Sequence, residues 1–134
     1  MDFHDNGTIS VDIDGQTYTL KRPNIGQLFD FYDYRTQLAT DAQEKLESLA
    51  AQMSELKEDD PQFDELMSQA KDRRFTFRYM VEPFLRRAFE ELGSKPLPEN
   101  LDQAPAEMTD PRLPNLILEF WRDTPLAHSP PRAR

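Results

Sequence analysis

The residue types that most often carry enzymatic chemistry are scarce in this chain and poorly placed for it. The sequence contains no cysteine, which excludes thiolate chemistry and disulfide bonds. Its two histidines, His4 and His128, stand one in each predicted tail. A catalytic or metal-binding imidazole must be held in place by neighbouring groups. We therefore expect no catalytic residue, no metal site and no cofactor, and predict that the protein is not an enzyme.

Carboxylates are abundant, but their spacing matches no metal-binding or catalytic motif. No Asp-x-Asp-x-Asp-Gly calcium loop occurs, and the four glycines are too far apart to form a phosphate-binding loop. Such carboxylates are typical of a solvated helix surface. The densest group consists of Glu44, Glu47, Glu55, Glu58, Asp59, Asp60, Asp64 and Glu65.

One stretch, residues 73–88, combines basic with aromatic side chains. It contains five arginines and a single acid, whereas residues 41–72 contain ten acids and three bases. Arginines between aromatics can stack on single-stranded nucleic acid, but the formal net charge of −9 disfavours a polyanionic ligand. Separated charge of this kind favours head-to-tail self-association or an acidic partner. We expect a homo-oligomer and no nucleic-acid partner.

The elements that must position these residues begin with a β-hairpin over 8–20. Residues 8–13 and 16–20 alternate polar with apolar side chains, and Asp14-Gly15 between them favours a type I′ turn. An isolated hairpin is only marginally stable in water, so its apolar face is expected to pack against helices. That face carries Ile9, Val11, Ile13, Tyr18 and Leu20.

Two helices are predicted next, over 24–58 and 61–92, as an antiparallel hairpin with a short connection. Asn24 and Gln27 form a capping-box pair at the first start, and Asp60-Pro61 suits the second. Pro83 should kink the second helix, because it lacks an N–H group and collides with the preceding turn. The apolar stripe predicted for the first helix is Ile25, Leu28, Tyr32, Ala39, Ala42, Leu46, Leu49, Met53 and Leu56.

The last part of the chain has a different composition, since residues 94–134 contain eight of the eleven prolines. We predict an irregular strap over 94–110, a short helix over 111–123 and a disordered tail over 125–134. The predicted fold is therefore mainly α (α+β): a β-hairpin, a long antiparallel helical hairpin and a short C-terminal helix. We predict a single domain over 1–128.

Aromatic residues are more numerous than one core-facing stripe requires. Large aromatics outside a core mark partner sites, so some of these are expected at a binding surface. Two roles stay open for Trp121, which either fixes the strap to the helical hairpin or anchors a partner. The candidate partner-binding residues are Phe75, Phe77, Tyr79, Phe84, Leu116, Phe120 and Trp121.

The order of these features resembles the tail assembly chaperones of long-tailed (siphovirus-type) bacteriophages. The similarity extends over most of residues 9–128. It rests on Ile-x-Val-x-Ile-Asp-Gly-x-x-Tyr-x-Leu-Lys-Arg-Pro, then Gly-Gln-Leu, an acidic helical hairpin, Leu-Pro-x-Leu-Ile-Leu-x-Phe-Trp-Arg and Thr-Pro-Leu-Ala.

This resemblance implies that the chain is the shorter, non-frameshifted product. It further implies binding of the tape measure protein, which would stay soluble while tail tube subunits polymerise around it. The expected location is the host cell cytoplasm, and the protein would be absent from the mature virion.

Two other functions fit the same sequence: a structural virion or scaffolding protein of a phage, and an acidic regulatory or inhibitor protein that binds a basic partner. A membrane partner is not expected, because the charge is negative and no window approaches about 20 apolar residues. No signal peptide is expected either, since residues 1–22 are acidic and lack a long apolar run.

Overall fold

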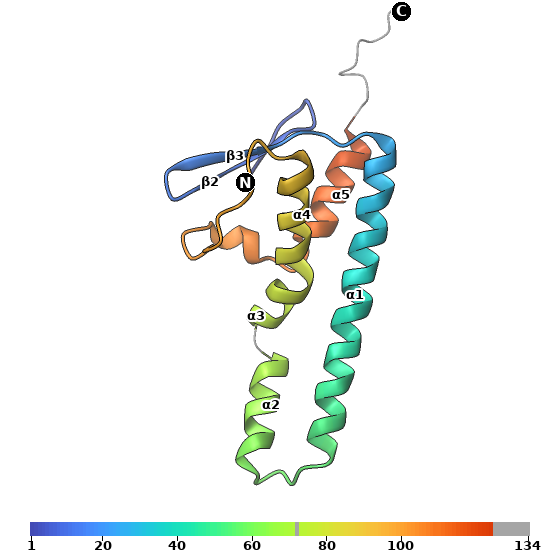
Figure 1. The fold of residues 1–134 in the computed structure, drawn as a ribbon, viewed down its shortest axis with the longest axis vertical. Helices are drawn as coiled ribbons and strands as arrows, with labels where there is room; N and C mark the ends of the chain where they lie inside the picture. Colours follow the sequence, from blue (N-terminus) through green and yellow to red (C-terminus); the bar gives the residue numbers. More distant parts are fainter. Residues whose placement is uncertain (72, 125–134) are drawn as a thin grey trace, which may run out of the picture.

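The structure is a computed structural model that describes residues 1–71 and 73–124. It is mainly helical, with a small N-terminal antiparallel sheet, a long antiparallel helical hairpin and a short C-terminal helix (Figure 1). The predicted fold class is confirmed. The predicted disordered tail over 125–134 lies outside the described residues.

The sheet has three strands in the order β1-β2-β3. The predicted hairpin is formed by β2 (Ile9–Ile13) and β3 (Gln16–Leu20), and all five residues of its predicted apolar face are buried. Asp14 and Gly15 have φ values of 51° and 78°, as a type I′ turn requires. β1 (Asp2–Phe3) pairs antiparallel with β2, and two residues are too few for an alternating pattern to predict it.

The outer edge of β3 forms backbone hydrogen bonds with the turn that follows the second helix of the helical hairpin. The Ser94 amide donates to the Thr19 carbonyl (2.8 Å), and the Lys21 amide donates to the Leu92 carbonyl (3.0 Å). Gly93 forms an isolated antiparallel bridge with Leu20. The sheet is thereby attached to the helices by backbone hydrogen bonds as well as by its apolar face.

The first arm of the helical hairpin is α1 (Ile25–Ser54), which begins with the predicted capping box. The Asn24 side chain accepts a hydrogen bond from the Gln27 amide (2.8 Å), and the Gln27 side chain accepts one from the Asn24 amide (3.0 Å). The predicted stripe needs correction at its start. Ile25 is 65% exposed while Phe31 is buried, because the rest of the fold packs on the side that carries Leu28 and Phe31.

The second helix of the hairpin was predicted over 61–92 with a kink near Pro83. This range contains α2 (Pro61–Lys71), α3 (Arg73–Thr76), a π-helical segment η1 (Phe77–Val81) and α4 (Glu82–Leu92). The Glu82 amide donates to the Phe77 carbonyl, five residues back, and Pro83 follows without an N–H to donate. The distortion predicted near Pro83 is present, in the form of a widened π turn.

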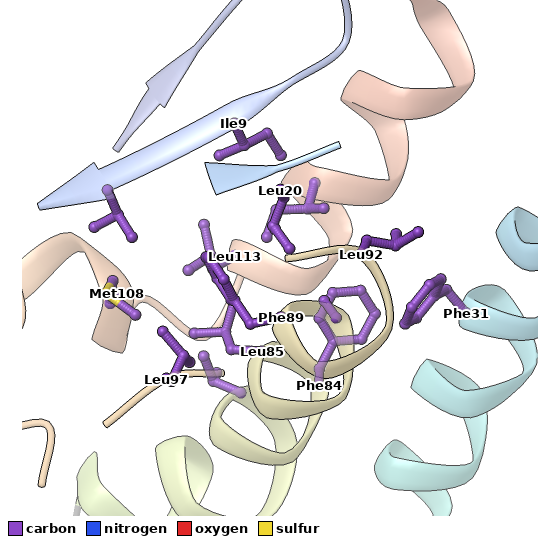
Figure 2. Packing of buried hydrophobic residues seen from close by; sticks show 14 of the residues in the cluster. Ile9, Leu20, Phe31, Phe84, Leu85, Phe89, Leu92, Leu97, Met108 and Leu113 are labelled. Carbon is purple, nitrogen blue, oxygen red and sulfur yellow. The ribbon is translucent and has the colours of Figure 1, made fainter. Parts of the chain in front are cut away.

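The hydrophobic core lies between the sheet, α4, the N-terminal part of α1 and α5 (Leu113–Asp123) (Figure 2). The Phe31 ring centroid lies 5.7 Å from both the Phe84 and the Trp121 centroids. Beyond Leu38 on α1, the buried residues no longer belong to this cluster. We call residues 42–71 the arm, which forms the lower half of Figure 1, and the remaining described residues the body.

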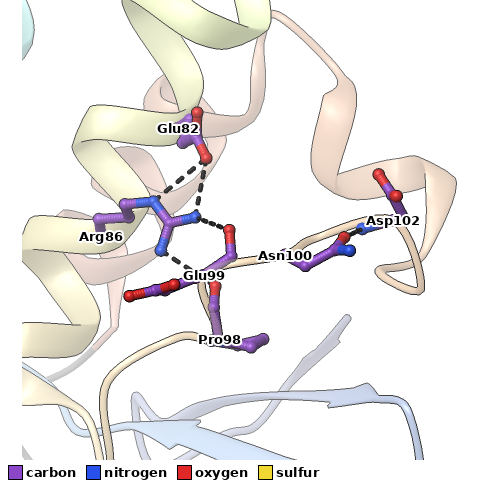
Figure 3. A network of polar contacts seen from close by, with 6 residues as sticks. All are labelled: Glu82, Arg86, Pro98, Glu99, Asn100 and Asp102. Atoms are coloured by element: carbon purple, nitrogen blue, oxygen red, sulfur yellow. Dashed lines mark hydrogen bonds and ion pairs between the residues drawn. The ribbon is translucent and has the colours of Figure 1, made fainter.

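The predicted strap crosses the body from α4 to α5 and contains a short 3₁₀ turn, η2 (Ala106–Thr109). Arg86 fixes it in place, as Figure 3 shows. Its guanidinium donates to the Pro98 carbonyl (3.1 Å) and the Glu99 carbonyl (2.9 Å) while pairing with Glu82 (2.9 Å). At the end of α5, Arg22 donates to the Trp121 carbonyl (3.0 Å), which ties that helix to the segment before α1.

Candidate partner-binding surfaces

Two of the seven predicted partner-binding residues belong to the core. Phe84 and Trp121 are 0% exposed, and the partly buried Phe77 packs against the same cluster. A side chain enclosed as Phe84 and Trp121 are cannot reach a partner unless the body opens, so these two assignments are corrected to core positions. Of the two roles left open for Trp121, its contact with Phe31 and its burial support the structural one.

The other two aromatic residues predicted on the second arm line a small pocket at the base of the arm. The Phe75 and Tyr79 ring centroids lie 4.7 Å apart, with the rings tilted by 48°. Around them lies a space of about 160 Å³. We call it the basic–aromatic pocket, and its lining residues are Lys45, Gln69, Arg74, Phe75, Arg78 and Tyr79.

The arginines of α4 and of the π-helical segment have different roles. Arg86 holds the strap, and Arg87 pairs with Glu91 while its guanidinium lies 4.5 Å from the Tyr34 ring centroid. Arg78 instead faces solvent at the pocket together with Lys45, and neither forms an ion pair with a residue that the structure describes.

Lys45 and Gln69 were missed by the sequence reasoning because they lie on the arm. The arginine run alone points to one helix. If the two predicted helices are aligned as an antiparallel hairpin, Lys45 lies opposite the arginine run, and this alignment would have identified it.

A second surface lies between β1 and α5. The Phe3 and Phe120 rings meet edge to face, with centroids 4.9 Å apart and an interplanar angle of 85°. Beside them Leu116 is 42% exposed. The space is open and has a volume of about 540 Å³. We call it the apolar groove, and it is lined by Phe3, Asp5, Leu116, Glu119, Phe120, Asp123 and Thr124.

Two of the predicted partner-binding residues, Leu116 and Phe120, lie in this groove, while Phe3 was missed. Phe3 stands in the predicted N-terminal tail, and the pairing of β1 with β2 brings it to α5. Acidic side chains surround the apolar floor. The hydrogen bond from Arg122 lowers the pKa of Asp123, so this rim carboxylate stays ionised at neutral pH.

Within the described ranges, no three histidine or carboxylate side chains are grouped so as to hold a metal ion. In the same ranges, no helix has the length and apolarity needed to cross a membrane. Comparison with protein-family models, curated proteins and solved structures found no match. The basic–aromatic pocket and the apolar groove are therefore the features from which a function can be inferred.

Proposed function

We propose that this chain is a bacteriophage tail assembly chaperone that binds amphipathic helical segments of the tape measure protein in its apolar groove. The groove is the observation that carries the proposal. Phe3, Leu116 and Phe120 present an apolar floor to solvent along the outer side of α5. A client helix with apolar residues at i, i+3, i+4 and i+7 matches such a surface.

The charge around the groove narrows the kind of helix that fits. Asp5 and Glu119 lie beside the floor and would attract lysines or arginines that flank the client's apolar stripe, whereas Asp123 is already paired with Arg122. The net charge of −9 would keep a complex with an aggregation-prone client soluble. The identity of the client comes from the sequence resemblance, and the groove supports its chemistry.

On this proposal, the protein acts in the host cell cytoplasm while tail tube subunits assemble, and it is absent from the mature virion. It is the shorter product of its gene. Mass spectrometry of purified particles provides an independent check. Detecting this chain in mature virions in a fixed copy number would support a structural virion protein instead.

The direct test is co-expression with the tape measure protein of the same phage, measuring the soluble fraction of that client. The wild-type chain is expected to keep the client in the supernatant, and Leu116→Asp is expected to abolish this effect by placing a charge on the groove floor. Phe29→Asp is the matched control, because Phe29 is 63% exposed and lies outside the groove.

The proposal fails if the wild-type chain leaves the client insoluble, or if Leu116→Asp performs as well as the wild type. Each variant is first checked for folding by the fluorescence of Trp121, the single tryptophan of the chain. Since Trp121 is fully buried, an unfolded variant would show a red-shifted emission.

A further inference from the structure

The basic–aromatic pocket takes no part in the proposed client binding, and its chemistry points to a different ligand. We infer that it receives the acidic tip of a second copy of this chain, so that copies associate head to tail. The acidic tip is defined as residues 55–65, which comprise the turn between α1 and α2 and the first residues of α2, at the far end of the arm.

The acidic tip carries charge that the described chain does not neutralise. It holds six acids and one base, Lys57. Asp60 is engaged locally, because its side chain accepts a hydrogen bond from the Gln62 amide (2.8 Å) at the start of α2. Glu58 and Asp59 are exposed on the connecting turn, and neither forms an ion pair with a described residue.

The pocket offers the complementary groups. Lys45 from α1 and Arg78 from η1 supply two cations beside the Phe75 and Tyr79 rings. An arginine can hold a carboxylate by two parallel hydrogen bonds, which gives the pair a defined geometry. Arg78 and Tyr79 stand in the π-helical segment, and such segments occur frequently at functional sites.

The carboxylates of Glu58 and Asp59 on the connecting turn cannot reach the pocket of their own chain. Lys45 precedes Glu55 by ten residues of continuous helix, which corresponds to about 15 Å. The carboxylates of the turn lie further away still. The carboxylates of the turn can therefore meet such a pocket only on another molecule, and an identical copy carries one.

A second copy fits better than a nucleic acid. A second copy carries the same net charge of −9, but its tip presents only a few carboxylates on a narrow turn, whereas a nucleic acid brings a continuous line of phosphates. Because the pocket and the tip are different surfaces, the interface is heterologous, and copies would add in one direction into a ring or an open array. The inference does not depend on the identity of the client.

The test is a charge-swap experiment on the purified full chain, followed by sedimentation velocity. One variant reverses the pocket, Lys45→Glu with Arg78→Glu, and another reverses the tip, Glu58→Lys with Asp59→Lys. Each is expected to weaken self-association about tenfold or more, since two exposed attractions become repulsions. An equimolar mixture of the two should restore association, because every pocket then meets a tip of opposite charge.

The matched control is Asp33→Lys with Glu90→Lys, which changes the net charge as much as the tip variant but at exposed positions outside both surfaces. It should associate as the wild type does. Wild-type association should also weaken between about 0.1 M and about 1 M salt, as the Debye length falls from about 10 Å to about 3 Å.

The inference is overturned if the wild-type chain stays monomeric in low salt, or if the reversed variants associate normally. It is equally overturned if the mixture fails to restore association while both variants are folded. If single-stranded oligonucleotides bind the wild type, and the pocket variant loses this binding with self-association unchanged, the pocket belongs to nucleic acid. The Leu116→Asp variant should associate normally, which separates this test from that of the client.

Discussion

Trp121 and Leu116 stand five residues apart on α5 and meet opposite environments. Trp121 is 0% exposed and contacts Phe31, whereas Leu116 is 42% exposed on the floor of the apolar groove. Five residues turn a helix by about 140°, so one short helix can fill the core with one side and line a binding surface with the other. Truncating Trp121 should therefore lower the free energy of unfolding much more than truncating Leu116.

We expect Trp121→Ala to lower the free energy of unfolding by about 3–5 kcal/mol, because it empties a fully enclosed site in the core. Leu116→Ala should change it by no more than about 0.5 kcal/mol, because the side chain is half exposed. Urea denaturation followed by circular dichroism measures both without relying on tryptophan fluorescence. Equal costs for the two variants would contradict the assignment of Trp121 to the core.

The sequence could not decide which aromatic residues face the core. Phe75, Tyr79 and Phe84 belong to the same predicted helix, and periodicity tells which residues share a face without telling which face other elements cover. The π segment also shifts the register between Tyr79 and Phe84, which no propensity indicates. Phe84 consequently lies in the core, while Phe75 and Tyr79 line a pocket.

At the scale of elements, the arm and the body differ in how many buried apolar side chains stabilise them. The arm has three buried apolar side chains, Ala42, Leu49 and Leu66, and none of them belongs to the core cluster. In contrast, α4 alone contributes five residues to that cluster. Local opening follows contact density, so the two parts should open with different free energies.

We predict that hydrogen exchange is faster in the arm than in α4. The informative comparison lies within α1, because one continuous helix runs from the body into the arm. Amides near Phe31 should be strongly protected, and amides beyond Leu49 should exchange by local opening at lower free energy. Uniform protection along α1 would show that the arm and the body unfold as one cooperative unit.

Elements with a local chemical signature were predictable. The Asp14-Gly15 turn and the Asn24–Gln27 capping box are encoded by a few adjacent residues, and both occur as expected. The division of the second arm was predicted only in part. Pro83 indicates a distortion because it lacks an N–H, but nothing nearby indicates that the distortion takes the form of a π-helical segment over Phe77–Val81.

For the molecule as a whole, two aspartates with lowered pKa values predict how stability depends on pH. Hydrogen bonds from Arg112 and Arg122 lower the pKa of Asp110 and Asp123, respectively, below the ordinary value for an aspartate. A group with a depressed pKa in the folded state stabilises the fold above its unfolded pKa of about 3.9. That contribution is lost as the pH falls through the lower, folded-state pKa.

We therefore expect these two pairs to lower the midpoint of urea unfolding as the pH falls from about 5 toward 3. The variant Asp110→Asn with Asp123→Asn should show a shallower fall. The difference should be small, because both carboxylates are exposed to solvent and are screened by it. A variant with an unchanged slope would show that these two pairs do not contribute to the pH dependence.

The attachment of β3 to the turn after α4 has a consequence for how this protein behaves in a crowded cell. An uncovered strand edge is a template for cross-β growth, in which further strands add by backbone pairing. Ser94 and the Leu92 carbonyl occupy bonding positions along one edge of this sheet, and the opposite edge is a strand of two residues. Copies of the chain can therefore reach a high local concentration while this sheet resists seeding amyloid fibrils.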